Sequence, residues 1–150
     1  MLENWKQYIH KDDFDKLVNF VENTKNGIKE KTVCVIYGPR KTGKSTFANQ
    51  LRENIGVMNV HHKQIGFLKR PSTGMGAKLI IVDNPEHYEF DDCVPHIKEY
   101  LSDTIIYRRP YTIQTKANIM IVSSDENFFD DFTQSTKNIF TVIRFVHEFT

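Results

Sequence analysis

A glycine-containing stretch in the first third of the chain has residue types and spacing that suit phosphate binding. Gly38 and Gly43 stand at the spacing of the P-loop pattern G-x-x-x-x-G-K-S/T, and the next two residues, Lys-Ser, complete it. The glycines let successive backbone N–H groups turn towards phosphate oxygens, the lysine reaches the β- and γ-phosphates, and the serine hydroxyl binds Mg²⁺. We therefore expect ATP and Mg²⁺ as cofactors. The residues expected to bind the nucleotide form one continuous run: Gly38, Pro39, Arg40, Lys41, Thr42, Gly43, Lys44, Ser45 and Thr46.

The segments on either side of this run predict how the chain presents it. Residues 32–37 are mostly β-branched and aromatic, which is typical of a buried parallel strand. Residues 45–54 can form a helix. A strand, a glycine loop and a helix N-terminus together form an anion-binding site.

A second apolar run, residues 77–83, ends in a carboxylate. A buried parallel strand here would deliver Asp83 to its C-terminal end, where ligands bind in open α/β sheets. Asp83 can then hold the Mg²⁺ that Ser45 also binds, although a strand that simply ends in Asp-Asn-Pro turn chemistry is the alternative. Glu86 is the nearest candidate for orienting or deprotonating an attacking water.

A third apolar strand, residues 118–122, is followed by a polar stretch. Polar groups at such a strand end can sense the γ-phosphate or the water, and Ser124 or Asp125 stands in that place. An ordinary turn after the strand explains the same residues.

Length and composition restrict the class of protein. A chain of 150 residues is most simply one domain. Its 20 basic and 19 acidic side chains nearly cancel, so a surface for nucleic acid must be local or produced by assembly. Cys34 and Cys93 show neither metal-ligand spacing nor a disulfide framework, which indicates reduced thiols in an intracellular protein. With no signal peptide and no apolar run of transmembrane length, we expect a soluble protein with no membrane partner.

Helical periodicity in two pieces over residues 2–24 predicts an N-terminal helical segment, 1–29, before a P-loop ATPase domain, 30–150. The other predicted elements are a strand at 56–60, an exposed loop at 61–63, a short helix at 94–101, a short strand at 104–107 and a last strand at 139–149.

In their order along the chain, these motifs resemble the ATPase domain of superfamily 3 helicases. Such domains occur in replication proteins of small DNA viruses, such as circovirus- and geminivirus-like replication initiators, and of positive-strand RNA viruses. The stretches that carry the resemblance are the Tyr-Gly-Pro loop at 37–45, the strand at 79–83, the helix and basic segments at 97–102, 108–109 and 116–118, the strand end at Ser124, and the closing strand at 142–149. The P-loop is specific to NTPases in general, and the order of the later motifs carries the family assignment.

The resemblance implies an α/β fold, a P-loop NTPase three-layer sandwich with a mostly parallel central sheet, similar to AAA+ proteins. It implies an ATPase that unwinds or translocates on nucleic acid during viral genome replication, in the host nucleus or cytoplasm. Its partners would be single-stranded DNA or RNA and further copies of itself in a ring homo-oligomer such as a hexamer.

The resemblance also implies roles for single residues. The implied catalytic residues are Lys44, Asp83, Glu86, Ser124 and Arg144, and the implied metal ligands are Ser45 and Asp83. Arg144 is the nearest match to the arginine finger that a neighbouring subunit supplies. Arg108, Arg109 and Lys116 would form a hairpin on the nucleic-acid backbone, and a solvated basic loop is the alternative.

Departures from the family pattern leave two other functions open. Asn84 stands where the family often has an acidic residue, and Ser124 or Asp125 replaces its sensor asparagine. Because losing a transition-state arginine costs orders of magnitude in rate, hydrolysis can be slow, and a degenerate NTP-binding module without hydrolysis is one alternative. A small nucleotide kinase, in which the Arg108–Arg109 pair clamps the acceptor's phosphate, is the other.

Overall fold

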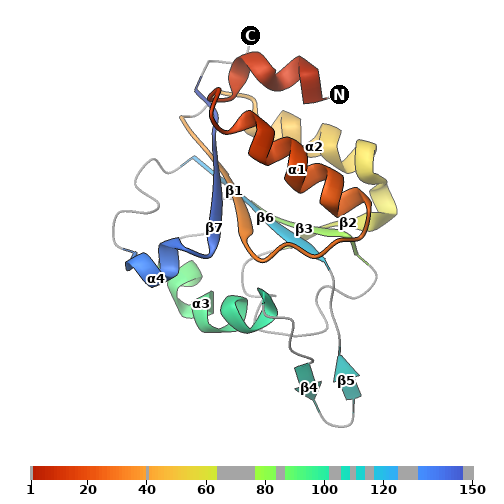
Figure 1. Cartoon of the computed structure of the whole chain (residues 1–150), viewed down its shortest axis with the longest axis vertical. Coiled ribbons are helices and arrows are strands. Elements are labelled where there is room, and N and C mark those ends of the chain that lie inside the picture. The colour runs from red at the N-terminus through yellow and green to blue at the C-terminus, as the bar shows by residue number, and fades with distance from the viewer. Residues whose placement is uncertain are drawn as a thin grey trace.

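A central parallel sheet with helices on both faces organises the chain, as the computed structural model shows (Figure 1). The structure describes residues 2–39, 41–63, 77–83, 87–101, 106–108, 111–113, 117–124 and 132–146. The elements are η1 (Leu2–Tyr8, a 3₁₀-helix), α1 (Phe14–Lys25), β1 (Val33–Tyr37), α2 (Lys44–Ile55), η2 (Val57–Asn59, a 3₁₀-turn), β2 (Val60–Lys63), β3 (Leu79–Asp83), α3 (His87–Leu101), β4 (Ile106–Arg108), β5 (Tyr111–Ile113), β6 (Asn118–Ser123), α4 (Gln134–Lys137) and β7 (Phe140–Arg144).

The strand order of the main sheet is β2-β3-β6-β1-β7, and every neighbouring pair is parallel. β1 is internal, between β6 and β7. The described sheet is thus wholly parallel, and the predicted fold class, a three-layer α/β sandwich of the P-loop NTPase type, is confirmed.

Burial explains why the internal strands read as continuous apolar runs. All four residues from Val33 to Ile36 are buried, because helices cover both faces of the sheet. Cys34 and Ile36 pack in a core with α1 and α2, whereas Val33 and Val35 pack in a second core with α3. Successive side chains of a strand point to opposite faces, so one short strand supplies both cores.

The two predicted segments around β2 differ from the structure. Residues 61–63, expected as an exposed loop, form most of β2, and the predicted strand at 56–60 is largely the turn η2. His61 and His62 pair in register with Ile80 and Ile81 of β3. Polar residues are tolerated in this strand because β2 lies at the edge of the sheet, where side chains remain partly exposed.

The helix expected at 94–101 begins earlier, at His87, and includes Pro95. Its buried side chains recur at helical spacing against the sheet: Phe90, Cys93, Val94, Ile97, Tyr100 and Leu101. The sequence contains this spacing, but the aspartates and the proline between the apolar residues are unfavourable in a helix interior, so the first two turns are not predicted.

The N-terminal segment packs against α2 and the end of β7, the elements next to the glycine loop. Trp5 contacts Phe47 of α2 edge-on, with ring centroids 5.4 Å apart, and its indole N–H donates to Gln50 at 2.9 Å. Ile9 forms an antiparallel bridge with Phe145, just past β7. The first residues are therefore part of the core beside α2, and the domain division at residue 29 stays a prediction.

A buried side chain on β6 ties three segments together. Asn118 Nδ2 donates to Thr24 Oγ1 (2.9 Å) and to the Ile28 carbonyl (3.0 Å), and Asn118 Oδ1 accepts from the Glu30 N–H (2.7 Å). The connector from α1 to β1 is thus fixed by one amide, which is 3% exposed.

We predict that Asn118→Ala lowers the free energy of unfolding by about 1–3 kcal/mol, because it leaves buried polar groups without partners. Urea denaturation measures the change. Asn19→Ala, at an exposed position of α1, is the matched control and should change stability by less than about 0.5 kcal/mol. Equal stability of the two variants would contradict this account.

Candidate nucleotide-binding site

The glycine loop connects the end of β1 to the start of α2, as predicted. Gly43 has a left-handed backbone (φ 84°, ψ 14°), and Lys41 is also left-handed (φ 68°). The N-cap residue of α2, a helix of 12 residues, is Gly43, which has no side chain to cap it, and the Phe47 N–H donates to the Gly43 carbonyl. The N–H groups of the first turn are therefore without intrahelical acceptors, which is the arrangement that binds phosphate at a helix start.

The first glycine of the loop is required by its contact with the segment that follows β7. A Cβ added at Gly38 would lie 2.3 Å from the backbone oxygen of Phe145. The Phe145 N–H also donates to the Tyr37 carbonyl at 2.9 Å. Gly38 is thus required because the backbone of Phe145 leaves no room for a side chain there, in addition to the role of glycine in turning the loop.

The loop lysine is held on the inner side of the loop. Lys44 is only 5% exposed, and its Nζ donates to the carbonyls of Gly38 (2.9 Å) and Pro39 (2.6 Å) and to Thr42 Oγ1 (3.1 Å). Burial lowers the pKa of the Lys44 ammonium. The structure therefore places this cation next to the turn where phosphates are expected.

The sheet register brings the other predicted groups to the same edge. Tyr37 aligns with Ser123, and Asp83 aligns with Val122, so β1, β6 and β3 end at nearly the same level. The Asp83 carboxylate is exposed there, and Ser124 is half-buried. Ser45 is exposed in the first turn of α2. Arg40, Asn84, Glu86 and Asp125 lie outside the described residues.

The donor set fits Mg²⁺ bound together with a nucleotide. Within the described part of the chain, no group of three or more His, Cys, Asp or Glu residues could hold a metal. Magnesium is commonly bound by one or two protein oxygens plus substrate phosphates and water. The Ser45 hydroxyl and the Asp83 carboxylate are oxygens of that kind.

The structure gives Arg144 a partner within its own chain. Its Nε donates to Asp13 Oδ2 at 2.8 Å, its backbone N–H donates to the same oxygen at 3.0 Å, and its Nη2 donates to Asp13 Oδ1 at 3.3 Å. The Asp13 side chain is 2% exposed. Burial by itself would raise the pKa of Asp13, but the hydrogen bonds and charge of Arg144, with Lys16 nearby, bring that pKa below its usual value.

The sequence does not predict this Asp13–Arg144 pair, because no local pattern links residues 131 positions apart. The arginine-finger role of Arg144 stays a prediction.

A two-stranded hairpin occurs in the region where the basic hairpin is predicted. β4 and β5 form an antiparallel pair separate from the main sheet, with Arg108 opposite Tyr111 (Figure 1). Arg109 and Lys116 lie outside the described residues, so the nucleic-acid contact stays a prediction.

Comparisons with known proteins agree with this architecture. No protein-family model and no curated relative matches the sequence. Among solved structures, the apo NrS-1 C-terminal region matches with a TM-score of 0.67 and 16% identity over 96% of this chain. A JCV helicase matches with a TM-score of 0.57 and 12% identity over 90% of the chain. A mutant of Thermotoga maritima RuvB matches with a TM-score of 0.58 and 15% identity over 94%.

The chain spans 38%, 40% and 48% of the lengths of these three structures, respectively. At such identities the likeness shows the fold. This chain therefore shares the fold of these helicase and RuvB structures, which is the α/β fold of the P-loop NTPase type that the sequence predicts.

Replacing the first loop glycine should disrupt the loop. We predict that Gly38→Ala lowers the free energy of unfolding by at least about 2 kcal/mol, because its methyl group overlaps the Phe145 backbone. Differential scanning fluorimetry and urea denaturation measure the effect. Gly27→Ala is the control: it also has positive φ, but no atom lies within 4 Å of the added Cβ, so only about 1 kcal/mol of backbone strain is expected.

The Asp13–Arg144 pair should make stability depend on pH. Because the folded-state pKa of Asp13 is lowered, its contribution is present above the unfolded value of about 3.9 and is lost as pH falls through the folded-state pKa. We predict that Asp13→Asn is less stable than wild type at pH 7, and that the difference narrows below about pH 4. Urea midpoints measured from pH 7 to pH 3 test this. Asp15→Asn, at an exposed position, should follow the wild-type profile, and a constant difference for Asp13→Asn would contradict the linkage.

Proposed function

We propose that this chain is an ATPase of superfamily 3 helicase type, which binds ATP with Mg²⁺ and couples hydrolysis to movement on single-stranded DNA or RNA during genome replication. The observation that carries the proposal is the loop between β1 and α2. This loop holds a buried lysine ammonium and leads into a helix whose N-cap is a glycine, and the carboxylate at the end of β3 lies at the same edge of the sheet.

The loop residues would bind the triphosphate. Backbone N–H groups of the run from Gly38 to Ser45, Pro39 excepted, would donate to phosphate oxygens. Lys44 would exchange the carbonyls of Gly38 and Pro39 for the β- and γ-phosphates. Burial destabilises the Lys44 ammonium, as its lowered pKa indicates, and a phosphate anion is a stronger acceptor for that ammonium than a carbonyl is, so the exchange is favourable.

Other groups at this edge would act on the γ-phosphate. Ser45 and Asp83 would hold Mg²⁺, which neutralises charge on the β- and γ-phosphates when it is bound. Glu86 would orient the attacking water, and Ser124 would sense the γ-phosphate. Arg144 would stabilise the transition state across a subunit boundary, and for that it would have to exchange Asp13 for phosphate.

Assembly would connect this site to nucleic acid. A chain with net charge +1 has little overall attraction for a polyanion. In a ring, copies of the hairpin that carries Arg108, Arg109 and Lys116 would line one channel and concentrate positive charge there. Viral origin and a nuclear or cytoplasmic location belong to the same proposal. No helix in the described part of the chain is long and apolar enough to cross a membrane.

A second candidate is a module that binds NTP without hydrolysing it. It is favoured by the intramolecular pairing of Arg144 with Asp13 and by Asn84, which follows Asp83 where an acidic residue is usual in such domains. In that case ATP would act as a structural ligand.

We predict Mg²⁺-dependent ATP hydrolysis that rises with protein concentration and with added oligothymidylate or polyuridylate. Lys44→Ala should lower turnover at least about 100-fold, because the charge on the β- and γ-phosphates then lacks its counter-ion. Lys31→Ala removes an exposed lysine ahead of β1 and should retain wild-type turnover.

Binding of a fluorescent ATP analogue, measured on the same samples, separates the candidates. Binding with turnover no faster than in Lys44→Ala would refute the ATPase and support the non-hydrolysing module. Transfer of phosphate to nucleoside monophosphates, with no response to polynucleotide, would indicate a kinase.

A further inference from the structure

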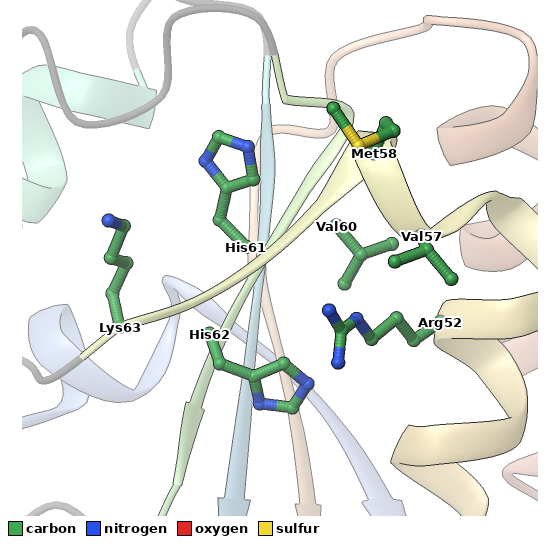
Figure 2. A pocket seen from close by; sticks show the side chains of 7 residues that line it. All are labelled: Arg52, Val57, Met58, Val60, His61, His62 and Lys63. Carbon is green, nitrogen blue, oxygen red and sulfur yellow. The ribbon is translucent and has the colours of Figure 1, made fainter.

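A hollow of about 460 Å³ lies at the β2 edge of the sheet, between that strand, η2 and the last turn of α2 (Figure 2). Arg52 reaches it from α2, eight residues after Lys44, which corresponds to about 12 Å along the helix. The Arg52 end of the hollow is thus distant from the start of α2, whereas Lys63 pairs in register with Val82, the residue before Asp83. β7 lies at the opposite edge of the sheet.

Basic side chains line the hollow on both faces of β2, with Arg52 on one face and Lys63 on the other. In Figure 2, His62 lies on the same side of the strand as Arg52, whereas His61 points to the other side. Lys63 follows His62 and lines the hollow on the His61 side. No Asp or Glu is among the described residues that line it. This charge distribution is complementary to an acidic ligand that contacts both faces of the strand.

The guanidinium of Arg52 lacks an acceptor at its inner nitrogen. Arg52 Nε is buried and has no hydrogen-bond partner among the described residues. Burying a charged donor without an acceptor is unfavourable, and a carboxylate can accept two parallel bonds from one guanidinium. Because Nε itself is buried, a docked carboxylate would bind at the outer nitrogens of the guanidinium and stabilise its charge there.

The backbone of β2 offers a second means of recognition. Within the described part of the chain, β2 pairs with β3 alone and is the outermost strand. Along a strand, alternate residues direct their N–H and C=O groups to opposite sides, so half of the backbone groups of β2 face outward. An extended peptide can add to such an edge, with its own side chains alternating between the two faces.

Exposed apolar groups adjoin the same edge. Met58 is 85% exposed and Val57 is 51% exposed, and both line the hollow. They provide contact area for an apolar side chain of a ligand. No Phe, Tyr or Trp is among the described lining residues, so the hollow has none of the large aromatic platforms on which nucleic-acid bases usually stack.

We propose that the outer edge of β2, with the hollow formed by Arg52, Met58, His61 and His62, is a docking site for an extended acidic segment of a partner protein. Acidic side chains of that segment would pair with the cations on both faces of β2, and its backbone would add a strand to the sheet. The proposal does not depend on nucleotide hydrolysis.

A labelled synthetic peptide of about seven residues, with two adjacent aspartates among valines, is a suitable probe for the whole chain, because adjacent residues of a strand point to opposite faces. In fluorescence anisotropy we expect saturable binding that weakens with added salt. Arg52→Gln should lower the affinity about tenfold, because it removes a charged bidentate partner. Lys137→Gln, at an exposed position of α4 just before β7 at the far edge, removes the same charge and should change the affinity less than about twofold.

One further variant and one further peptide test the proposal independently of Arg52. Met58→Glu alters an exposed side chain, so the fold is retained, and the added negative charge should weaken peptide binding. A peptide of the same charge with alternate backbone nitrogens methylated should not bind, because it cannot pair with β2. Equal binding of the methylated peptide, no binding of either peptide, or binding of oligothymidylate in place of the peptide with sensitivity to Arg52→Gln would each overturn the proposal.

Discussion

The backbone of Phe145 lies against Gly38 so closely that no side chain fits between them. This contact joins the end of β7 to the first residue of the glycine loop, and pairing with β1 and with the N-terminal segment holds it in place. β7 pairs along the whole of β1, and Ile9 bridges to Phe145 from the N-terminal segment. The loop is therefore held on one side by a strand more than 100 residues later in the sequence, and its shape depends on the folding of the whole chain.

An aromatic cluster supports the same contact from the helical side. Trp5, Phe47 and Phe145 come from η1, α2 and the end of β7, with ring centroids 5.4–6.2 Å apart. Aromatic pairs in such tilted and edge-on arrangements add specific geometry to the burial of apolar area. The start of the chain thus fixes α2 relative to β7, and with it the helix N-terminus that faces the expected phosphates.

Three cations in the structure have three different environments, and the differences correspond to different functions. Lys44 donates to loop oxygens that phosphates could replace, and Arg144 is neutralised by a buried carboxylate. Arg52 has a buried Nε without an acceptor among the described residues. Because a buried charge is stable only with suitable partners, these environments agree with the proposed ligand exchange at Lys44 and the proposed acidic partner at Arg52, whereas Arg144 already has its partner in Asp13.

The sequence by itself determined the loop, the two strands that follow it in the sheet core, and the expectation that Asp83 and Ser124 end at one edge. These features depend on local patterns: the spacing of glycine, lysine and serine, and apolar runs that only a doubly covered parallel strand explains. The tertiary structure decided which groups pair across the chain. The Asp13–Arg144 ion pair, the Gly38–Phe145 approach and the inclusion of His61 and His62 in an edge strand all depend on strand order and register. No local pattern contains that information, because register is set by the simultaneous burial of both sheet faces and by contacts between residues far apart in the sequence.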